Sequence, residues 1–399
     1  MLKLITFVAV LFAALIPLEQ TDAAGASLKI YWSKPVPSGA LLPSEALVLR
    51  DLTHSTDGSI VLHAAGGRSR LLLVGPDETR SGSVIHLRSK AGVLASKIAP
   101  GIDNTFWLGG RVNQRAYVPG GDIADAYLGR LDHQGRIIAE YTFKSSKFRM
   151  IQDLLSLPSG EVIVAGVDGN ENWLGIVSDQ GKLLWERRFG VGKGIALTTI
   201  SDRIMAVAFE RTTVNDKKRY QEDVAVWSFD QTGNMLARQI IRTGINENRG
   251  GHYGRLAIER SNDAIYVLSS WGDLFNAKPI EVTRLSVDGN LLWRKELLHS
   301  ISQQTNKART WGSCNQDQTV LADGDLLVAC SIKDQIFISR LDAKGGDLTV
   351  TSVPLPACHE SRPAALFLNQ KLNGAIWLFG SRPGNNVGAS CTWLGELSL

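Results

Sequence analysis

The chain has 399 residues, of which 44% are hydrophobic and 21% are charged, and its formal net charge is +4. This composition is typical of a globular protein with a large core and excludes a disordered chain. The charge is mild and no run of Lys and Arg exceeds three residues, so no nucleic-acid-binding surface is predicted.

Residues 1–24 have the pattern of a secretory signal peptide. Lys3 precedes the apolar run Leu4–Leu18, and small residues follow that run. The run is about 15 residues long and is interrupted by Pro17, which is short for a membrane span of ~20 residues. No other segment is predicted to span a membrane. We therefore expect an exported protein, periplasmic or secreted, whose mature part is residues 25–399.

One hairpin pattern recurs along the mature chain. The index copy, NWLGIVSDQGKLLWERRF, has an apolar strand, a polar turn that ends in glycine, and a second apolar strand. The six copies are Ser83–Pro100, Ala126–Phe143, Asn172–Phe189, Val224–Ile241, Ile280–Leu297 and Ile336–Val353. Their turn glycines are 43 to 56 residues apart, a period that is typical of propeller blades rather than of helical solenoids.

A second hairpin is predicted before each of these copies, because a short turn signal separates two apolar runs. The turn signals are Asp57-Gly58, Ser159-Gly160, Asp202-Arg203, Asn262-Asp263, Asp323-Gly324 and Asn373-Gly374, with a weaker one at Gln114–Val118. Each repeat is therefore predicted to hold four antiparallel strands, numbered first to fourth from the axis outward.

The hairpins also predict how the ring closes. Seven hairpins join a first to a second strand, but only six join a third to a fourth. The final segment Thr392–Leu399 matches a third strand, and Gly25–Ser33 resembles the missing fourth strand, so their pairing would remove two free sheet edges. The predicted fold is all-β: a seven-bladed β-propeller of four-stranded antiparallel blades, closed by pairing of the N-terminal strand with the C-terminal blade. A ring of six or eight blades is the alternative.

Four cysteines in an exported chain predict two disulfides. Cys314 and Cys330 are symmetric about Ala322, which we take as the centre of a hairpin, so we expect these two to face each other. Cys358 then pairs with Cys391. Three pairings are open to four cysteines, and all of them would be structural bridges, since the chain has no C-x-x-C motif.

In a propeller, the turns between first and second strands and between third and fourth strands share one face. These turns are short here, whereas the connections on the opposite face are long. The long connections are Ala65–Gly82, Glu210–Glu222, Thr243–Gly254, Trp271–Pro279, His299–Gly312, Pro354–Arg362 and Ser381–Ser390. Loops on a rigid scaffold usually carry the binding site, so this face is the predicted one. The alternative is that the loops are neutral insertions.

Nine residues are predicted to lie at or near the mouth of the central channel on the long-loop face. They are Trp107, Lys193, Arg211, His252, Arg255, Trp271, Arg309, Trp311 and Arg362. Together they could bind an anionic or carbohydrate ligand through charge-assisted hydrogen bonds and stacking. The alternative is that the Trp side chains fill the space between blades.

Catalytic and metal-binding motifs are mostly missing from the sequence. There is no H-E-x-x-H or G-x-S-x-G motif, and the histidines lack metal-ligand spacing, so we assign no catalytic residue and no metal ligand. The stretch Gly190–Gly194 resembles part of a phosphate loop but lacks its Ser or Thr, and Asp168–Asn172 has only part of a calcium-loop pattern. We predict a connection between blades and a turn, respectively. His252 is a candidate acid or base.

Two copies of the repeat, Gly181-x-x-x-Trp185 and Gly289-x-x-x-Trp293, resemble the repeat of PQQ-like (quinoprotein-type) bacterial β-propellers. The resemblance implies a propeller fold and export. The other copies have Ala95, Ala139, Ala237 and Thr349 in place of Trp, and no vicinal cysteine pair is present. We therefore carry over no cofactor.

These observations favour an exported, non-catalytic propeller that binds a protein partner through its long-loop face. An envelope assembly factor or an inhibitor of an exported protein would fit this description. The alternative is an enzyme that acts on a carbohydrate or another polar small molecule at the channel mouth.

Overall fold

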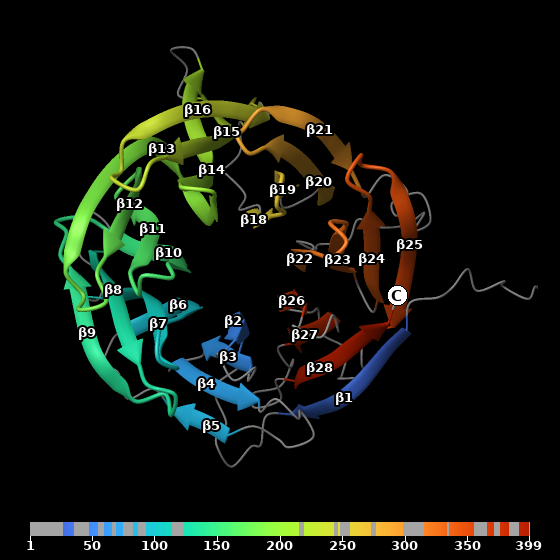
Figure 1. The fold of residues 1–399 in the computed structure, drawn as a ribbon, viewed down its shortest axis with the longest axis horizontal. Helices are drawn as coiled ribbons and strands as arrows, with labels where there is room; N and C mark the ends of the chain where they lie inside the picture. The colour runs from blue at the N-terminus through green and yellow to red at the C-terminus, as the bar shows by residue number, and fades with distance from the viewer. Residues whose placement is uncertain are drawn as a thin grey trace, which may run out of the picture.

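The computed structural model describes residues 27–35, 48–54, 60–65, 69–74, 83–86, 93–113, 123–214, 219–242, 246–247, 256–272, 277–297, 315–332, 335–354, 365–370, 376–382 and 391–398. In this part of the chain every regular element is a β-strand (Figure 1). No helix long and apolar enough to cross a membrane occurs among these residues.

The described strands form five sheets of four strands and one sheet of eight, which surround a common centre (Figure 1). The first two sheets along the chain contain β2 (Val48–His54), β3 (Ile60–Ala65), β4 (Ser69–Val74) and β5 (Ser83–His86), then β6 (Val93–Pro100), β7 (Phe106–Asn113), β8 (Ala124–Leu131) and β9 (Ile137–Phe143). All their strand pairs are antiparallel, and β2 and β6 lie nearer the centre than β5 and β9 (Figure 1).

The eight-stranded sheet follows. It contains β10 (Arg149–Ser156), β11 (Val162–Asp168), β12 (Glu171–Val177), β13 (Leu183–Ile200), β14 (Arg203–Val214), β15 (Arg219–Phe229) and β16 (Met235–Arg242), with the short β17 (Asn246–Glu247) beside β15.

Three further four-stranded sheets complete the described part of the chain. Two of them contain β18 (Leu256–Arg260), β19 (Ala264–Gly272), β20 (Ala277–Ser286) and β21 (Leu291–Glu296), then β22 (Asn315–Val320), β23 (Leu326–Ile332), β24 (Gln335–Leu341) and β25 (Asp347–Pro354). The last contains β26 (Ala365–Gln370), β27 (Ile376–Arg382), β28 (Cys391–Ser398) and β1 (Ser27–Pro35).

The pairing of β1 with β28 confirms the predicted contact between the two ends of the chain. Leu28 lies opposite Leu397 and Ser33 opposite Trp393 in an antiparallel ladder. The N-terminal strand is thus the outermost strand of the last sheet, where it covers an edge that β28 would otherwise expose.

The eight-stranded sheet consists of two four-stranded units that share β13. Residues 183–191 pair with β12 in the first unit, and residues 192–200 pair with β14 in the second unit. Gly190 and Gly194 have φ angles of +56° and +68°, and a Cβ on Gly192 would collide with the carbonyl oxygen of Phe209. The predicted connection at Gly190–Gly194 is therefore present as one continuous strand, and its glycines are needed by the backbone itself.

The first predicted copy of the repeat, Ser83–Pro100, is wrong. Its two halves are β5, the outer strand of the first sheet, and β6, the inner strand of the next. The true third strand of the first sheet is β4, which lies within the predicted long loop Ala65–Gly82. Apolar alternation is similar in inner and outer strands, so the pattern alone did not reveal this shift. The weaker turn at Gln114–Val118 is also wrong as the turn between first and second strands, because β6 and β7 are joined by residues 101–105, and residues 114–118 themselves lie outside the described residues.

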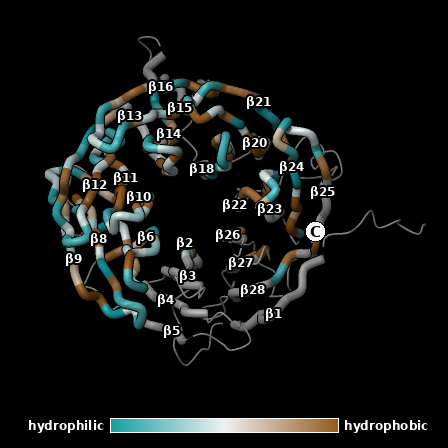
Figure 2. Tube along the Cα trace, in the orientation of Figure 1, coloured by the Kyte–Doolittle hydropathy of each residue, from teal (hydrophilic) through white to brown (hydrophobic). Residues whose placement is uncertain are grey.

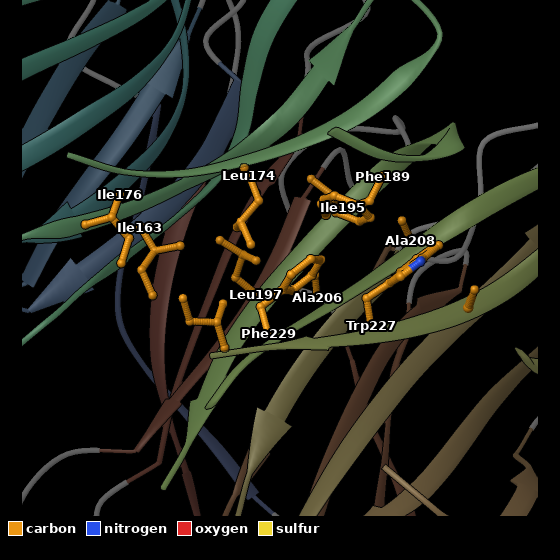
Figure 3. Close-up of a cluster of buried hydrophobic side chains, with 13 residues drawn as sticks. Ile163, Leu174, Ile176, Phe189, Ile195, Leu197, Ala206, Ala208, Trp227 and Phe229 are labelled. Atoms are coloured by element: carbon orange, nitrogen blue, oxygen red, sulfur yellow. The ribbon is translucent and has the colours of Figure 1, made fainter. Parts of the chain in front are cut away.

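Neighbouring sheets pack face to face through apolar side chains. Between the two units that share β13, Ile163 and Leu174 of the first unit pack in one cluster with Leu197, Trp227 and Phe229 of the second (Figure 3). The middle strands β11 and β12 therefore bury both faces, and hydrophobic residues lie along them (Figure 2).

Five turns between third and fourth strands share one construction, and these confirm the predicted turns at Gly135, Gly181, Gly233, Gly289 and Gly345. Each of these glycines has a φ angle between +74° and +88°. A carboxylate or hydroxyl at the start of the turn accepts backbone N–H groups: Asp230 Oδ1, for example, accepts from Thr232 at 2.9 Å and from Asn234 at 2.8 Å. The recurring Asp/Ser-x-x-Gly pattern is thus a self-capped turn.

The Trp of the recurring motif joins one sheet to the next. Trp185 Nε1 donates to the carbonyl oxygen of Gln231 at 2.9 Å, and its ring lies against Gly233. Trp293 makes the same contact with Ala343 at 3.0 Å and lies against Gly345. The Gly-x-x-x-Trp spacing therefore places a ring on the turn of the following sheet.

Candidate functional site

The inner strands carry a repeated irregularity near the axis. In β2, β6, β10 and β13 one extra residue interrupts the pairing with the second strand; these residues are Arg50, Ser96, Gln152 and Gly194. Gly166 lies opposite the bulge in β10, and a Cβ there would collide with the carbonyl oxygen of Met150. A bulge re-aims the side chain beside it, so the residue that follows it can be polar.

Three charged residues directly follow these bulges and meet one another. Lys97 Nζ lies 3.6 Å from Asp51 Oδ1 and 3.4 Å from Asp153 Oδ1. The lysine of β6 is therefore placed between the carboxylates of β2 and β10, the inner strands on either side of it.

The carboxylates also tie successive inner strands together. Asp51 Oδ2 accepts the backbone N–H of Ile98 at 2.9 Å, and Asp153 Oδ2 accepts that of Leu197 at 2.7 Å. Asp317 of β22 does the same with Leu368 of β26, at 2.9 Å. These hydrogen bonds join neighbouring inner strands at three of the sheet junctions, and they hold the inner strands in place around the axis.

Glu259 of β18 is the chemically distinctive residue of this region. Burial, together with the nearby charges of Asp317 and Asp153, raises its pKa to about 8, although the charges of Arg260 and Lys97 act in the opposite direction. Burial also raises the pKa of Asp51 to about 6, against the charge of Lys97. We call Asp51, Lys97, Asp153, Glu259 and Asp317 the axial set.

The axial set offers one unusual chemical group. At neutral pH the Glu259 carboxyl is mostly protonated, so it can donate a hydrogen bond or a proton, unlike an ordinary glutamate. The side chain of Glu259 makes no hydrogen bond with another described residue, whereas the side chains of the three aspartates do. Among the described residues, no group of three or more His, Cys, Asp or Glu side chains is arranged to hold a metal.

Residues at the start of β10, at the end of β11 and within β13 form a tightly paired ionic cluster. The guanidinium of Arg149 is buried, lies 4.1 Å from the ring centroid of Trp173, and pairs with Glu186. Asp168 accepts from Arg188 at 2.6 Å and from the Ser145 hydroxyl at 2.7 Å.

These contacts decide the charge of Asp168. Burial alone would raise its pKa, but the hydrogen bonds from Arg188 and Ser145 lower it below its ordinary value. Asp168 lies opposite Glu171 at the tight end of the β11–β12 hairpin, which confirms the turn predicted at Asp168–Asn172. The acidic residues of this stretch therefore have a structural role.

The β14–β15 hairpin is the longest on this rim in the described part of the chain. Strand β11 ends at Asp168 and β12 begins at Glu171, whereas β14 continues to Val214 and β15 begins at Arg219. The ladder is unbroken from Ile204↔Phe229 to Val214↔Arg219. The segment predicted as the loop Glu210–Glu222 is therefore largely strand, and we name its outer part, residues 211–222, the β14–β15 extension.

Two of the predicted site residues, Trp107 and Arg211, have described side chains. Trp107 lies in β7 and is 1% exposed, with the guanidinium of Arg130 at 5.5 Å from its ring. Its predicted place at the channel mouth is therefore wrong, and the alternative of core packing holds for it. Arg211 is half-buried at the base of the extension.

Most of the other predicted residues cannot be placed. Lys193 belongs to β13 and Trp271 to β19, but their side chains are not among those described. His252, Arg255, Arg309, Trp311 and Arg362 lie outside the described residues. Of the nine predicted residues, Trp107 and Arg211 are the two whose side chains are described, and they lie in different sheets.

The cysteines are described in part. Cys330 is buried in β23 and is disulfide-bonded. It lies opposite Gln316, so the hairpin is not centred on Ala322. The prediction that Cys314 lies directly opposite Cys330 is therefore wrong, because the residue opposite Cys330 is two positions further along the chain. Cys314 and Cys358 lie outside the described residues, Cys391 is the first residue of β28, and the pairings stay predictions.

Sequence reasoning missed the axial set, although a signal for it was present. Asp51, Asp153 and Asp317 each stand seven residues before the glycine of a first hairpin turn, at Gly58, Gly160 and Gly324. A polar residue at a fixed distance from a recurring turn, inside an otherwise apolar strand, indicates a shared structural role.

Comparison with known proteins supports the fold. No protein-family model matches the chain, and no curated protein matches its sequence. The chain is similar to BBS1N, solved in complex with ARL6DN, at 12% identity over 94% of this chain and 98% of that one, with a TM-score of 0.53. It is also similar to the polysaccharide lyase Uly1, at 8% identity over 93% and 100%, with a TM-score of 0.54. These likenesses are of fold alone, and they make the chain an all-β protein of the β-propeller-like kind.

Proposed function

We propose that the chain is a seven-bladed β-propeller, of the PQQ-like repeat type and closed by its termini, which is exported and binds a protein partner without catalysis. The two units that share β13, the four-stranded sheets and the β1–β28 ladder support the count and the closure. The signal-peptide pattern at residues 1–24 supports export to the periplasm or the exterior.

The observation that carries partner binding is the β14–β15 extension. The β14–β15 ladder has 11 residue pairs, against eight in the β19–β20 hairpin and seven in the β11–β12 hairpin, and β17 pairs with it through Tyr220↔Glu247. At about 3.3 Å per residue, residues 211–214 alone project by roughly 13 Å. A regular, hydrogen-bonded projection from a rigid sheet is a preformed surface for a macromolecule rather than a pocket for a small ligand.

A deletion tests this proposal. Glu210 and Asp223 lie opposite each other, so residues 211–222 can be replaced by Asn-Gly, a two-residue turn suited to a hairpin. The matched control exchanges the turn Asp230–Asn234 for the equivalent turn Asp342–Gly346. We expect a partner captured from an envelope extract, identified by mass spectrometry, to be lost with the deletion only. Equal capture by both variants, with unchanged thermal unfolding, would contradict the proposal.

A second function, an enzyme for a carbohydrate or another polar small molecule, is favoured by one observation. Glu259 has a carboxyl group that is protonated near neutral pH, as a general acid requires. In that case Glu259→Gln would abolish turnover in a screen of polysaccharides and glycosides while Arg260→Gln retained it. If the wild-type protein shows no turnover, this candidate is removed.

A further inference from the structure

The side-chain amide of Gln318 in β22 uses only its nitrogen. Gln318 is 2% exposed, and its Nε2 donates to the carbonyl oxygen of Tyr266 at 3.0 Å and to that of Ala257 at 3.4 Å. Because two acceptors surround Nε2, the orientation of the amide is fixed. Oε1 is therefore a buried acceptor, and it has no hydrogen-bond partner among the described residues. A native protein rarely leaves such an atom without a donor.

Glu259 of β18 faces Gln318 across the junction between their sheets, near the common centre (Figure 1). The β18–β19 ladder is regular, so successive residues of β18 point to opposite faces. Ile258 packs with residues of β13 and β14, whereas Ala257 packs with residues of β23 and β24. Glu259 therefore points to the same side as Ala257, toward the sheet that contains Gln318. Tyr266, whose carbonyl oxygen accepts from Gln318, lies directly opposite Glu259.

The Glu259 carboxyl is the donor that the amide lacks. Burial, with the charges of Asp317 and Asp153, raises the pKa of Glu259 to about 8, so the carboxyl holds a proton at neutral pH. A protonated carboxyl has one O–H donor, and that of Glu259 makes no hydrogen bond with another described residue. A donor without an acceptor and an acceptor without a donor therefore face each other at this junction.

The other titratable and charged groups around Glu259 come from its own strand and from the strands that surround it. They are Arg260 of β18, Tyr266 of β19, Asp317 of β22, Asp153 of β10 and Lys97 of β6. Each of these five has a hydrogen-bond or ion-pair partner of its own among the described residues. None of them supplies the acceptor for the Glu259 proton.

This junction also lacks the aspartate hydrogen bond that is found at others. Asp51, Asp153 and Asp317 each stand three residues before the end of an inner strand and accept a backbone N–H from the next sheet. In β18 the residue at this position is Ala257, which has no side-chain acceptor. A hydrogen bond between the side chains of Glu259 and Gln318 would supply the missing connection.

We propose that the protonated carboxyl of Glu259 donates a hydrogen bond to Gln318 Oε1, and that this bond joins the β18–β21 and β22–β25 sheets at the axis. The connection depends on one proton, because an ionised carboxylate and an amide oxygen are both acceptors. It is present while Glu259 is protonated and is lost when Glu259 ionises. Gln318 is then a positioning residue for the acid group. This inference concerns the scaffold and does not depend on partner binding.

The stability of Gln318→Leu at two pH values tests the proposal. The substitution removes the acceptor, and urea denaturation at pH 6 and at pH 9.5 measures its cost. Relative to wild type, we expect the unfolding equilibrium constant to rise about fivefold more at pH 6, where the bond exists, than at pH 9.5. Thr319→Val, at the next residue of β22, is the matched control and should have the same effect at both pH values. An equal cost of Gln318→Leu at both pH values overturns the proposal.

Infrared difference spectra between pH 6 and pH 9.5 give a readout that a purely structural role of Gln318 would not change. Wild type should show the C=O band of a carboxyl that loses its proton, and Glu259→Gln should lack this band. In Gln318→Leu the band should change frequency, and its midpoint should fall by about 0.5 to 1 pH unit, because the bond favours the neutral form. The Glu259→Gln variant keeps an N–H donor that does not titrate.

Wild type alone decides the question if Gln318→Leu does not fold. The ¹³C signal of the Gln318 side-chain carbonyl should then titrate with the midpoint of the infrared band. Absence of a Glu259 band overturns the proposal, and so does a Gln318 signal that does not titrate. A band that is identical in wild type and in folded Gln318→Leu overturns it as well, and would assign the acceptor of the Glu259 proton to water.

Discussion

Asp230 at an outer turn and Asp51 at the axis have pKa values that are shifted in opposite directions. At an outer turn, the hydroxyl of Thr232 and the backbone N–H groups of Asn234 and Thr232 lower the pKa of Asp230 to about 2. At the axis, burial raises the pKa of Asp51 to about 6. Both residues join backbone segments, but the outer one is only half-buried and is surrounded by donors, whereas the inner one is buried.

This contrast shows that neighbouring sheets are held by two different means. The outer contacts are aromatic rings that lie against turn glycines, and they differ between junctions. Trp185 lies on Gly233, but Ala237 places no ring on Gly289, where a Cβ would meet only Met205 Cε, at 3.8 Å. The inner contacts are buried or half-buried carboxylates that accept backbone N–H groups. The outer contacts should depend on shape, whereas the inner contact of Asp51 should depend on pH.

The largest effect is expected at an outer turn where a ring touches the glycine. In Gly181→Ala, the new Cβ would collide with the ring of Tyr141, and the φ angle of +79° is itself unfavourable for alanine. We expect a loss of about 3 kcal/mol in the free energy of unfolding, measured by urea denaturation.

Gly324→Ala is the matched control for this change. Gly324 has a similar φ angle of +89°, but no atom lies within 4 Å of a Cβ built there. It should therefore lose only the backbone contribution, about 1 kcal/mol. Equal losses at the two glycines would show that the ring contact of Tyr141 contributes nothing.

A smaller effect is expected when the ring itself is removed. Trp185→Ala deletes the stacking on Gly233 and the hydrogen bond to the carbonyl oxygen of Gln231. Because the ring is only partly buried, we expect a loss of about 2 kcal/mol rather than the larger loss at a fully buried Trp. Ala237→Trp is the reverse test, since it offers Gly289 the ring that it lacks. A loss below about 0.5 kcal/mol for Trp185→Ala would mean that the outer contacts are dispensable.

Glu259 of the axial set should make the free energy of unfolding depend on pH. The folded-state pKa of Glu259 is about 8, above its ordinary value of 4.5, so the folded protein holds this proton more tightly than the unfolded chain. Stability is therefore highest below pH 4.5 with respect to this group and falls as pH rises toward 8, by at most ~1.4 kcal/mol per pH unit.

Glu259→Gln should remove this dependence and leave the variant more stable than wild type at pH 8.5. Denaturation midpoints between pH 5 and 9 would measure it, with Glu296→Gln, an exposed residue of β21, as the control. Parallel pH profiles for wild type and Glu259→Gln would show that the axial charges do not act on Glu259.

The sequence predicts the strands and turns well because each turn is specified locally. An Asp or Ser that caps the turn and a glycine with positive φ act within five residues, as at Asp230–Asn234. The pairing of β1 with β28 could also be predicted, because an unpaired third strand demands a fourth. The assignment failed at Ser83–Pro100, where only a longer-range contact distinguishes an outer strand from an inner one.

The candidate site was harder to predict because its residues come from different inner strands that approach one another only in the folded chain. Lys97 lies within reach of Asp51 and Asp153, which are 46 and 56 residues away in the chain. Trp107 shows the opposite error: the residue type suggested a ligand contact, but its place in β7 is in the core. Residue type alone does not fix position, whereas spacing from a turn does.

The smallest effect is expected at the junction where no aromatic ring lies against the turn glycine, which is Gly289. Arg203 donates to Asp288 Oδ1 at 2.9 Å across this junction, and the two side chains are 35% and 59% exposed. An exposed ion pair contributes about 0.5 kcal/mol or less and is screened by salt, so Arg203→Ala should have a small effect that disappears in 1 M NaCl. A loss above about 1.5 kcal/mol that persists in salt would mean instead that this pair substitutes for the missing aromatic contact, and that the outer junctions are equally strong by different chemistry.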